Sequence, residues 1–333
     1  MPAVPPKQLA QVIIDAFDEC DASAILLSDL RGNPRRFFVQ VGKNTFEVWL
    51  YVWTLTHGGG AARPAQEYRV QITGVTPPLP VNPNGPTALV GYEPNTGCFA
   101  GFDLDKHRQF SEKSPSIQIP ITALHLALQN GFSFTTKGNN EIAIGIRPDQ
   151  FLAYCLNSVL LHKEGADASM TGLLSRAASL ETILDEEVLE IPTERRRIVS
   201  EISKLSRDAS FRRKVITAYD RRCAVTRMQL RLIDAAHILP VGADDSVDEV
   251  FNGLCLSPTY HRAFDRALIF LDGSLRMQIN PAKEMELVKL GLDGGLSDFK
   301  AYLGQRIHLP ADPQQWPKPE YIHAANTFRK IST

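Results

Sequence analysis

The pattern of apolar residues changes twice along this chain of 333 residues. From Arg36 to about Arg147, apolar and polar residues alternate over short segments, which is typical of β-strands. The segments read FFVQV, FEVWLYVWTLT, EYRVQITGV, TALVGYE, CFAGFDL, SIQIPI and NEIAIGIR. Helical spacing follows, and the last third mixes short strand-like and helical segments. This order of patterns predicts an α+β protein with two cores.

We therefore predict three parts. Residues 1–162 form a β-rich domain, opened by a helix near Pro6–Phe17 and closed by another near Asp149–His162. A pseudobarrel is one architecture that such strands could adopt. Residues 163–192 form a helical connector, and residues 193–333 form a second domain with a basic leading helix and a C-terminal supporting segment.

Charge is distributed unevenly along the chain. The net charge is -1, which by itself argues against a nucleic-acid partner. Leu173 to Pro192 carries five acidic residues and one Arg, whereas Thr193 to Leu232 carries twelve Lys or Arg and four Asp or Glu. A solvated helix face would explain such a basic run, but its position directly before the segment described next favours phosphate binding.

The sequence also indicates a compartment. No apolar run approaches the roughly 18 residues that a membrane span needs, and the start MPAVPPKQLAQ lacks the order of a signal peptide. The cysteines are odd in number and form no C-x-x-C pair, which argues against a disulfide framework and a cysteine zinc site. We expect a cytoplasmic protein with reduced thiols at Cys20, Cys98, Cys155, Cys223 and Cys255.

The segment with recognisable chemistry lies between Tyr219 and Gly273. It contains AAHI-x-P, then NGLCLSP-x-x-H, then HR-x-FD, in that order. Over about 210–272 the sequence resembles the HNH (ββα-metal) endonuclease superfamily, in the branch of predicted and modification-dependent restriction endonucleases. The resemblance implies a ββα-metal fold and a DNA endonuclease whose substrate is double-stranded DNA.

His237 is the predicted general base. It follows an apolar, strand-like run and precedes Ile238-Leu239-Pro240, so it lies where a strand ends and a loop begins. A neutral imidazole at such a position can take a proton from water near neutral pH. A buried structural histidine is the alternative, which the companion motifs disfavour. In the resembled family the Asn of this motif braces the loop and orients the catalytic His. The resemblance therefore assigns this role to Asn252.

A divalent metal site is predicted on the following helix. His261 and Asp265 are four residues apart, which places an imidazole and a carboxylate on one helix face. A mixed nitrogen and oxygen pair suits Mg²⁺ or Mn²⁺. Many HNH enzymes have a further ligand directly before the general base, but Ala236 cannot coordinate a metal. Asp234 is the nearest candidate, although an offset of three in a strand points it to the opposite face unless a bulge intervenes.

Five arginines near these motifs are candidate clamps for DNA phosphates, because guanidinium groups bind phosphate oxygens in pairs. They could equally be surface charges. They are Arg221, Arg222, Arg227, Arg262 and Arg266.

The aromatic residues of FEVWLYVWTLT are candidates for target recognition. Alternation places Trp49, Tyr51 and Trp53 on one face of the strand. Such a face is either a second core face or a surface that stacks on a base, as in readers of modified bases. Beyond it, Gly58-Gly59-Gly60 predicts a turn.

Two functions therefore remain as the main alternatives, beside a third, which is a binding module with a lapsed nuclease centre. The first is a restriction enzyme with a DNA-reading N-terminal domain, which would act as a homodimer to cut both strands of plain or modified DNA. The second is a nuclease effector of anti-phage defence, whose N-terminal domain senses a small molecule or a protein.

Overall fold

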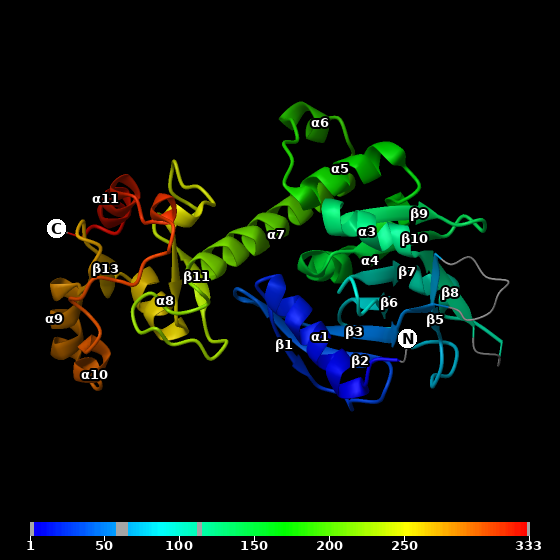
Figure 1. Cartoon of the computed structure of the whole chain (residues 1–333), viewed down its shortest axis with the longest axis horizontal. Helices are drawn as coiled ribbons and strands as arrows, with labels where there is room; N and C mark the ends of the chain where they lie inside the picture. Colours follow the sequence, from blue (N-terminus) through cyan, green and yellow to red (C-terminus); the bar gives the residue numbers. More distant parts are fainter. Residues whose placement is uncertain (1–2, 58–65, 112–114, 332–333) are drawn as a thin grey trace. The chain divides into compact units, whose positions relative to one another are not determined.

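The computed structural model of the chain describes residues 3–57, 66–111 and 115–331 (Figure 1). It contains both helices and sheets, and the predicted α+β class is confirmed. Two compact units divide the chain, residues 1–209 and residues 210–333. The predicted glycine turn at residues 58–60 lies outside the described residues.

The first unit is built on a seven-stranded mixed sheet. Its strand order is β1-β2-β3-β6-β7-β10-β9, with β3 and β6 parallel and the other neighbours antiparallel. The pseudobarrel considered above is not formed by the described strand pairings, in which the edge strands β1 and β9 do not pair. The strands are β1 (Ser23–Leu26), β2 (Arg35–Val41), β3 (Asn44–Thr54), β6 (Thr87–Tyr92), β7 (Phe99–Phe102), β9 (Phe132–Thr136) and β10 (Ile142–Ile146).

One face of this sheet packs against helices. The helices α1 (Pro6–Glu19) and α4 (Phe151–Glu164) bury aromatic rings on it, with the Phe17 and Phe151 centroids 5.2 Å apart. Both helices were expected, and each runs two residues beyond its predicted end. Apolar burial of this kind supplies most of the stability of a helix in a protein.

The opposite face forms a second core. It is closed by α3 (Ile121–Asn130) and a three-stranded sheet of β4 (Thr56–His57), β5 (Glu67–Gln71) and β8 (Ser116–Pro120). Both faces of β3 are therefore apolar. Val48, Leu50 and Val52 lie in the first core, whereas Tyr51 and Trp53 belong to the second.

Helices complete the first unit. The segment predicted as a connector contributes α5 (Ala168–Ser179), which contacts α3 and β9, and α6 (Asp185–Leu189). The basic helix is α7 (Thr193–Ala218), and the division between the units falls within its residues. No helix among the described residues is long and apolar enough to cross a membrane.

The second unit is small and mixed. The hairpin of β11 (Asp234–His237) and β12 (Gly253–Leu256) is followed directly by α8 (Pro258–Asp265). A second hairpin, β13 (Ile269–Leu271) with β14 (Met277–Ile279), and the helices α9 (Pro281–Leu290), α10 (Leu296–Lys300) and α11 (Pro319–Phe328) come after them. Buried residues of β13, β14 and α11 join those of β11, β12 and α8 in one core.

The contact between β7 and α4 gives a stability prediction. A Cβ at Gly101 would lie 2.3 Å from Cζ of the Tyr154 ring, which is completely buried. Replacing Gly101 by Ala should therefore reduce the free energy of unfolding by about 2 kcal/mol, because the overpacked ring has no room to move. Chemical denaturation measures this change.

Gly172 is the matched control. It lies within α5, and a Cβ there would meet no atom within 4 Å. Gly172→Ala should leave stability unchanged or raise it by about 0.5–1 kcal/mol through helix propensity. Equal stability of Gly101→Ala and the wild type would contradict the packing described here.

Candidate active site

The strands β11 and β12 and the helix α8 form the ββα arrangement that the resemblance implied. The hairpin pairs Ala236 with Leu254 and His237 with Gly253 in a regular antiparallel register. Pro258 occupies the first turn of α8, where its missing N–H leaves no hydrogen bond unmade. His237 is the last residue of β11, so its ring lies at the entrance of the loop that leads to β12.

The His237 ring is held from two sides. It stacks on Phe211 of α7, with centroids 3.7 Å apart and an angle of 12° between the rings. Its Nε2 lies 2.9 Å from Oδ1 of Asp248. An ionised carboxylate can only accept, so this contact makes Nε2 the donor and places a lone pair of the neutral ring on Nδ1. The side chain is 17% exposed, which leaves the ring accessible at the surface.

Asn252 holds the loop after His237. Its side chain is completely buried, and its Oδ1 accepts from Leu239 N at 2.8 Å. Its Nδ2 donates to Val247 O at 2.9 Å and, at 3.3 Å, to Leu239 O and Ser246 Oγ. The backbone adds a bond from Ile238 N to Asn252 O at 2.8 Å. One amide thus ties both ends of the loop together, which is the geometry a bracing residue requires.

His261 lies between two carboxylates. Its Nδ1 is 3.1 Å from Oδ2 of Asp234, and its Nε2 is 3.5 Å from Oδ2 of Asp265. β11 pairs without a bulge, and Asp234 contacts this ring from the start of the strand. Ala236 is completely buried and faces the core.

His261 can share one divalent cation with one of the two neighbouring carboxylates. The protein would therefore supply two ligands to the cation and not the three expected from the sequence. The two nitrogens of an imidazole point away from each other, so Asp234 and Asp265 lie on opposite sides of the His261 ring. Accordingly, no group of three His, Cys, Asp or Glu among the described residues is arranged around one point. A pair of one imidazole and one carboxylate, completed by water, suits a small cation that keeps much of its hydration.

The five candidate arginines differ in exposure. Arg221, Arg262 and Arg266 are exposed, while Arg222 and Arg227 are half-buried. Arg222 Nε lies 3.5 Å from Oδ2 of Asp220, a surface ion pair of small energetic weight.

The aromatic residues of β3 lie in different surroundings. Tyr51 is completely buried and its hydroxyl donates to Pro80 O at 2.8 Å, so its ring presents no face to a base in this structure. Trp53 is half-buried and stacks with Tyr51, their centroids 6.4 Å apart. Trp49 is half-buried and donates to Glu47 Oε1 at 2.6 Å. The strand face that carries these aromatic residues is therefore largely a second core face, which was one of the two alternatives that the sequence alternation allowed.

Three residues near His237 were not singled out from the sequence. Phe211 and Asp248 contact its ring, and Arg329 donates to Ile238 O at 2.7 Å from the end of the chain. Burial lowers the pKa of Arg329, whose guanidinium also covers the Phe264 ring at 4.5 Å. Phe211 belongs to the apolar stripe of α7 and Asp248 to an acidic loop, and neither pattern distinguishes them from their neighbours.

The Asn252 network predicts a measurable loss of stability. Asn252→Ala should lower the free energy of unfolding by about 2–3 kcal/mol, because Leu239 N and Val247 O would then lack buried partners. Gln229→Ala is the control, since this side chain is exposed in the same unit. Thermal and chemical unfolding of both variants would test this, and equal stabilities would contradict the bracing role.

Comparisons with known proteins match two parts of the chain. Residues 223–272 match the family model described as "HNH endonuclease", and residues 46–155 match the one described as "Methylase-associated X1". The solved structure titled "Modification dependent TagI restriction endonuclease" is 11% identical over 86% of this chain and 81% of that chain, with a TM-score of 0.29, too low to establish a common fold. No curated protein matches. Residues 223–272 are therefore an HNH endonuclease domain, and the chain is an HNH-type DNA endonuclease.

Proposed function

We propose that this endonuclease is a metal-dependent restriction enzyme that hydrolyses phosphodiester bonds of double-stranded DNA, with His237 as general base. The observation that carries the mechanism is the ring of His237, fixed between Phe211 and Asp248 at the end of β11. A fixed ring loses little freedom on reaching the transition state, which favours proton transfer at a set position.

The tautomer of His237 determines which of its nitrogens accepts the proton. With Nε2–H donating to Asp248, the lone pair on Nδ1 takes a proton from a water molecule. The resulting hydroxide attacks phosphorus, the bond to the departing oxygen breaks, and that oxygen is protonated by solvent. Asp248 stabilises the imidazolium that forms, and Asn252 keeps the loop in place.

His261 and Asp265 are the residues that would hold Mg²⁺ or Mn²⁺. Their separation of 3.5 Å suits two ligands of one ion, whereas Asp234, at 3.1 Å from the other nitrogen, is placed to orient the ring. When bound, the cation would neutralise charge on the scissile phosphate and the departing oxygen. This assigns Asp234 a positioning role in place of the third ligand expected from the sequence.

The restriction role is supported by the pairing of an HNH domain with a region whose model is described as methylase-associated. We assign contacts with DNA phosphates to Arg262 of α8 and to Arg266, which directly follows that helix, because both are exposed. A homodimer would cut both strands. The described cysteines are free and buried, which suits the reducing cytoplasm in which we place the protein.

Removal of the proposed general base should slow cleavage strongly. His237→Ala should cut plasmid DNA at least about 100-fold more slowly than the wild type, since proton transfer to a positioned base contributes this much or more. His323→Ala, at an exposed position of α11, should cut at the wild-type rate. Cleavage by His237→Ala at the wild-type rate would refute the mechanism.

The two carboxylates beside His261 should differ in their effects. Asp265→Asn should raise the Mn²⁺ concentration needed for half-maximal cleavage at least about tenfold, because a ligand is lost. Asp234→Asn should mainly slow cleavage at saturating Mn²⁺. Calorimetric titration of Mn²⁺ gives a second measure without DNA. The reverse order of effects would show that Asp234 is the ligand.

A further inference from the structure

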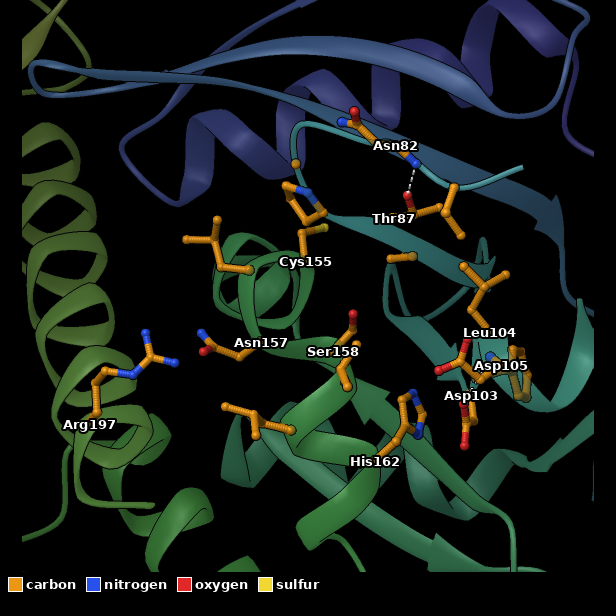
Figure 2. A pocket seen from close by; sticks show the side chains of 18 residues that line it. Asn82, Thr87, Asp103, Leu104, Asp105, Cys155, Asn157, Ser158, His162 and Arg197 are labelled. Carbon is orange, nitrogen blue, oxygen red and sulfur yellow. Dashed lines mark hydrogen bonds between the residues drawn. The ribbon is translucent and has the colours of Figure 1, made fainter. Parts of the chain in front are cut away.

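A cavity of about 280 Å³ lies within the first unit (Figure 2). It is bounded by α4, the segment 81–88 before and within β6, the start of α2 (Leu104–His107), and Arg197 of α7. Its volume is just below the roughly 300–1,000 Å³ of typical small-molecule sites. The cavity could therefore hold a ligand of about the size of one nucleotide.

Two polar residues interrupt the buried surface of α4 at this cavity. Asn157 and Ser158 are only 4% and 8% exposed, in a helix that is otherwise mostly apolar on its buried sides. Asn157 Nδ2 donates to Ala153 O at 3.1 Å, but the Ser158 hydroxyl forms no hydrogen bond with any residue in the described ranges. The Ser158 oxygen is not among the fully buried, unpartnered side-chain atoms of the described residues, so it is accessible from the cavity. Ser158 therefore offers a hydroxyl to a ligand in the cavity.

Opposite charges lie at the two sides of the cavity. Asp103 and Asp105 lie on one side, Arg197 on the other and Ser158 between them (Figure 2). Asp103 caps α2, accepting from Asp105 N at 3.1 Å through Oδ1. Burial lowers the pKa of the fourth titratable group at the cavity, His162, to about 4, so this ring is neutral near pH 7. Arg197 is thus the cation among the described lining residues.

The geometry points to a site for one nucleotide whose base carries an exocyclic amine. Asp103 accepts from the amine, as carboxylates do from cytosine N4, and Ser158 bonds the edge of the base. Leu104, Leu156 and Val159 line the cavity and flank the ring, while Arg197 binds the phosphate. The same chemistry could come from a base extruded from duplex DNA or from a free nucleotide, and the first source rests on the proposed restriction function.

Two comparisons between single deoxynucleotides, one with and one without an exocyclic amine, test whether the cavity recognises the amine. Calorimetric titration of the full chain should show dCMP binding at least about tenfold tighter than dUMP, or dAMP tighter than dIMP, since the second member of each pair has a carbonyl in place of the exocyclic amine and an N–H in place of the adjacent ring-nitrogen acceptor. Asp103→Asn should remove this preference and still cap α2, because Asn is an equally good N-cap. Asp29→Asn, an equal charge change at an exposed position, should retain it.

Ser158 provides an independent measure. Ser158→Ala should unfold at the same temperature as the wild type or higher, because Ala has a higher helix propensity than Ser. Its affinity for the preferred nucleotide, or for duplex DNA, should fall about fivefold or more. A merely structural serine would give lower stability and unchanged affinity.

Competition between duplex DNA and a nucleotide shows whether the ligand of the cavity is an extruded base or a free nucleotide. If an extruded base occupies the cavity, duplex DNA displaces the nucleotide, and Asp103→Asn weakens duplex binding relative to Asp29→Asn. If a free nucleotide is the ligand, its addition changes the cleavage rate without competing with DNA. The inference is overturned if neither nucleotide pair shows a preference and both cavity variants bind duplex DNA like the wild type. Cleavage by the wild type in parallel keeps this outcome distinct from failure of the proposed function.

Discussion

The active site depends on one buried amide. Asn252 satisfies both a donor and three acceptors of the loop between β11 and β12, and its backbone carbonyl accepts from Ile238. A loop of this kind would otherwise carry buried polar groups without partners, each at a cost of about 1–3 kcal/mol. Because the loop follows His237 directly and contains Asp248, the same network determines where the ring and its carboxylate partner lie.

Distant parts of the chain complete this arrangement. Phe211 comes from the C-terminal third of the basic helix α7 and covers one face of the His237 ring. Arg329 comes from near the end of the described residues and donates to the carbonyl of Ile238. The C-terminal segment therefore does more than cover the core, since it contributes a contact next to the general base. His261 is held in the same way, between carboxylates of β11 and α8.

The sequence predicted the parts of the site that depend on short spacing. His261 and Asp265 are one helical turn apart, and His237 ends a strand, so local geometry is sufficient to place them. It could not predict Phe211 or Asp248, because their contacts with His237 depend on how α7 and a loop fold back on the hairpin. The regular alternation placed Asp234 on the face opposite to His237, but it could not predict that Asp234 contacts His261, which comes from α8.

In the N-terminal unit, too, the sequence could not predict contacts that depend on the tertiary fold. Periodicity placed Trp49, Tyr51 and Trp53 on one face of β3, and it could not distinguish a surface from a second core. The three-stranded sheet and α3 cover that face, which buries Tyr51. The polar cavity beside α4 left no pattern in the sequence, since Asp103, Ser158 and Arg197 are far apart along the chain and meet only in the folded unit.

Cleavage of supercoiled plasmid by the wild-type protein tests the central claim most directly. The substrates are matched plasmids without modified bases and with methylated or hydroxymethylated cytosine, each incubated with Mg²⁺, with Mn²⁺ and with a chelator. We predict linear or open-circular product from at least one plasmid when Mg²⁺ or Mn²⁺ is present, and none with the chelator. Cleavage that persists in the chelator, or intact plasmid in every combination, would contradict a metal-dependent HNH centre.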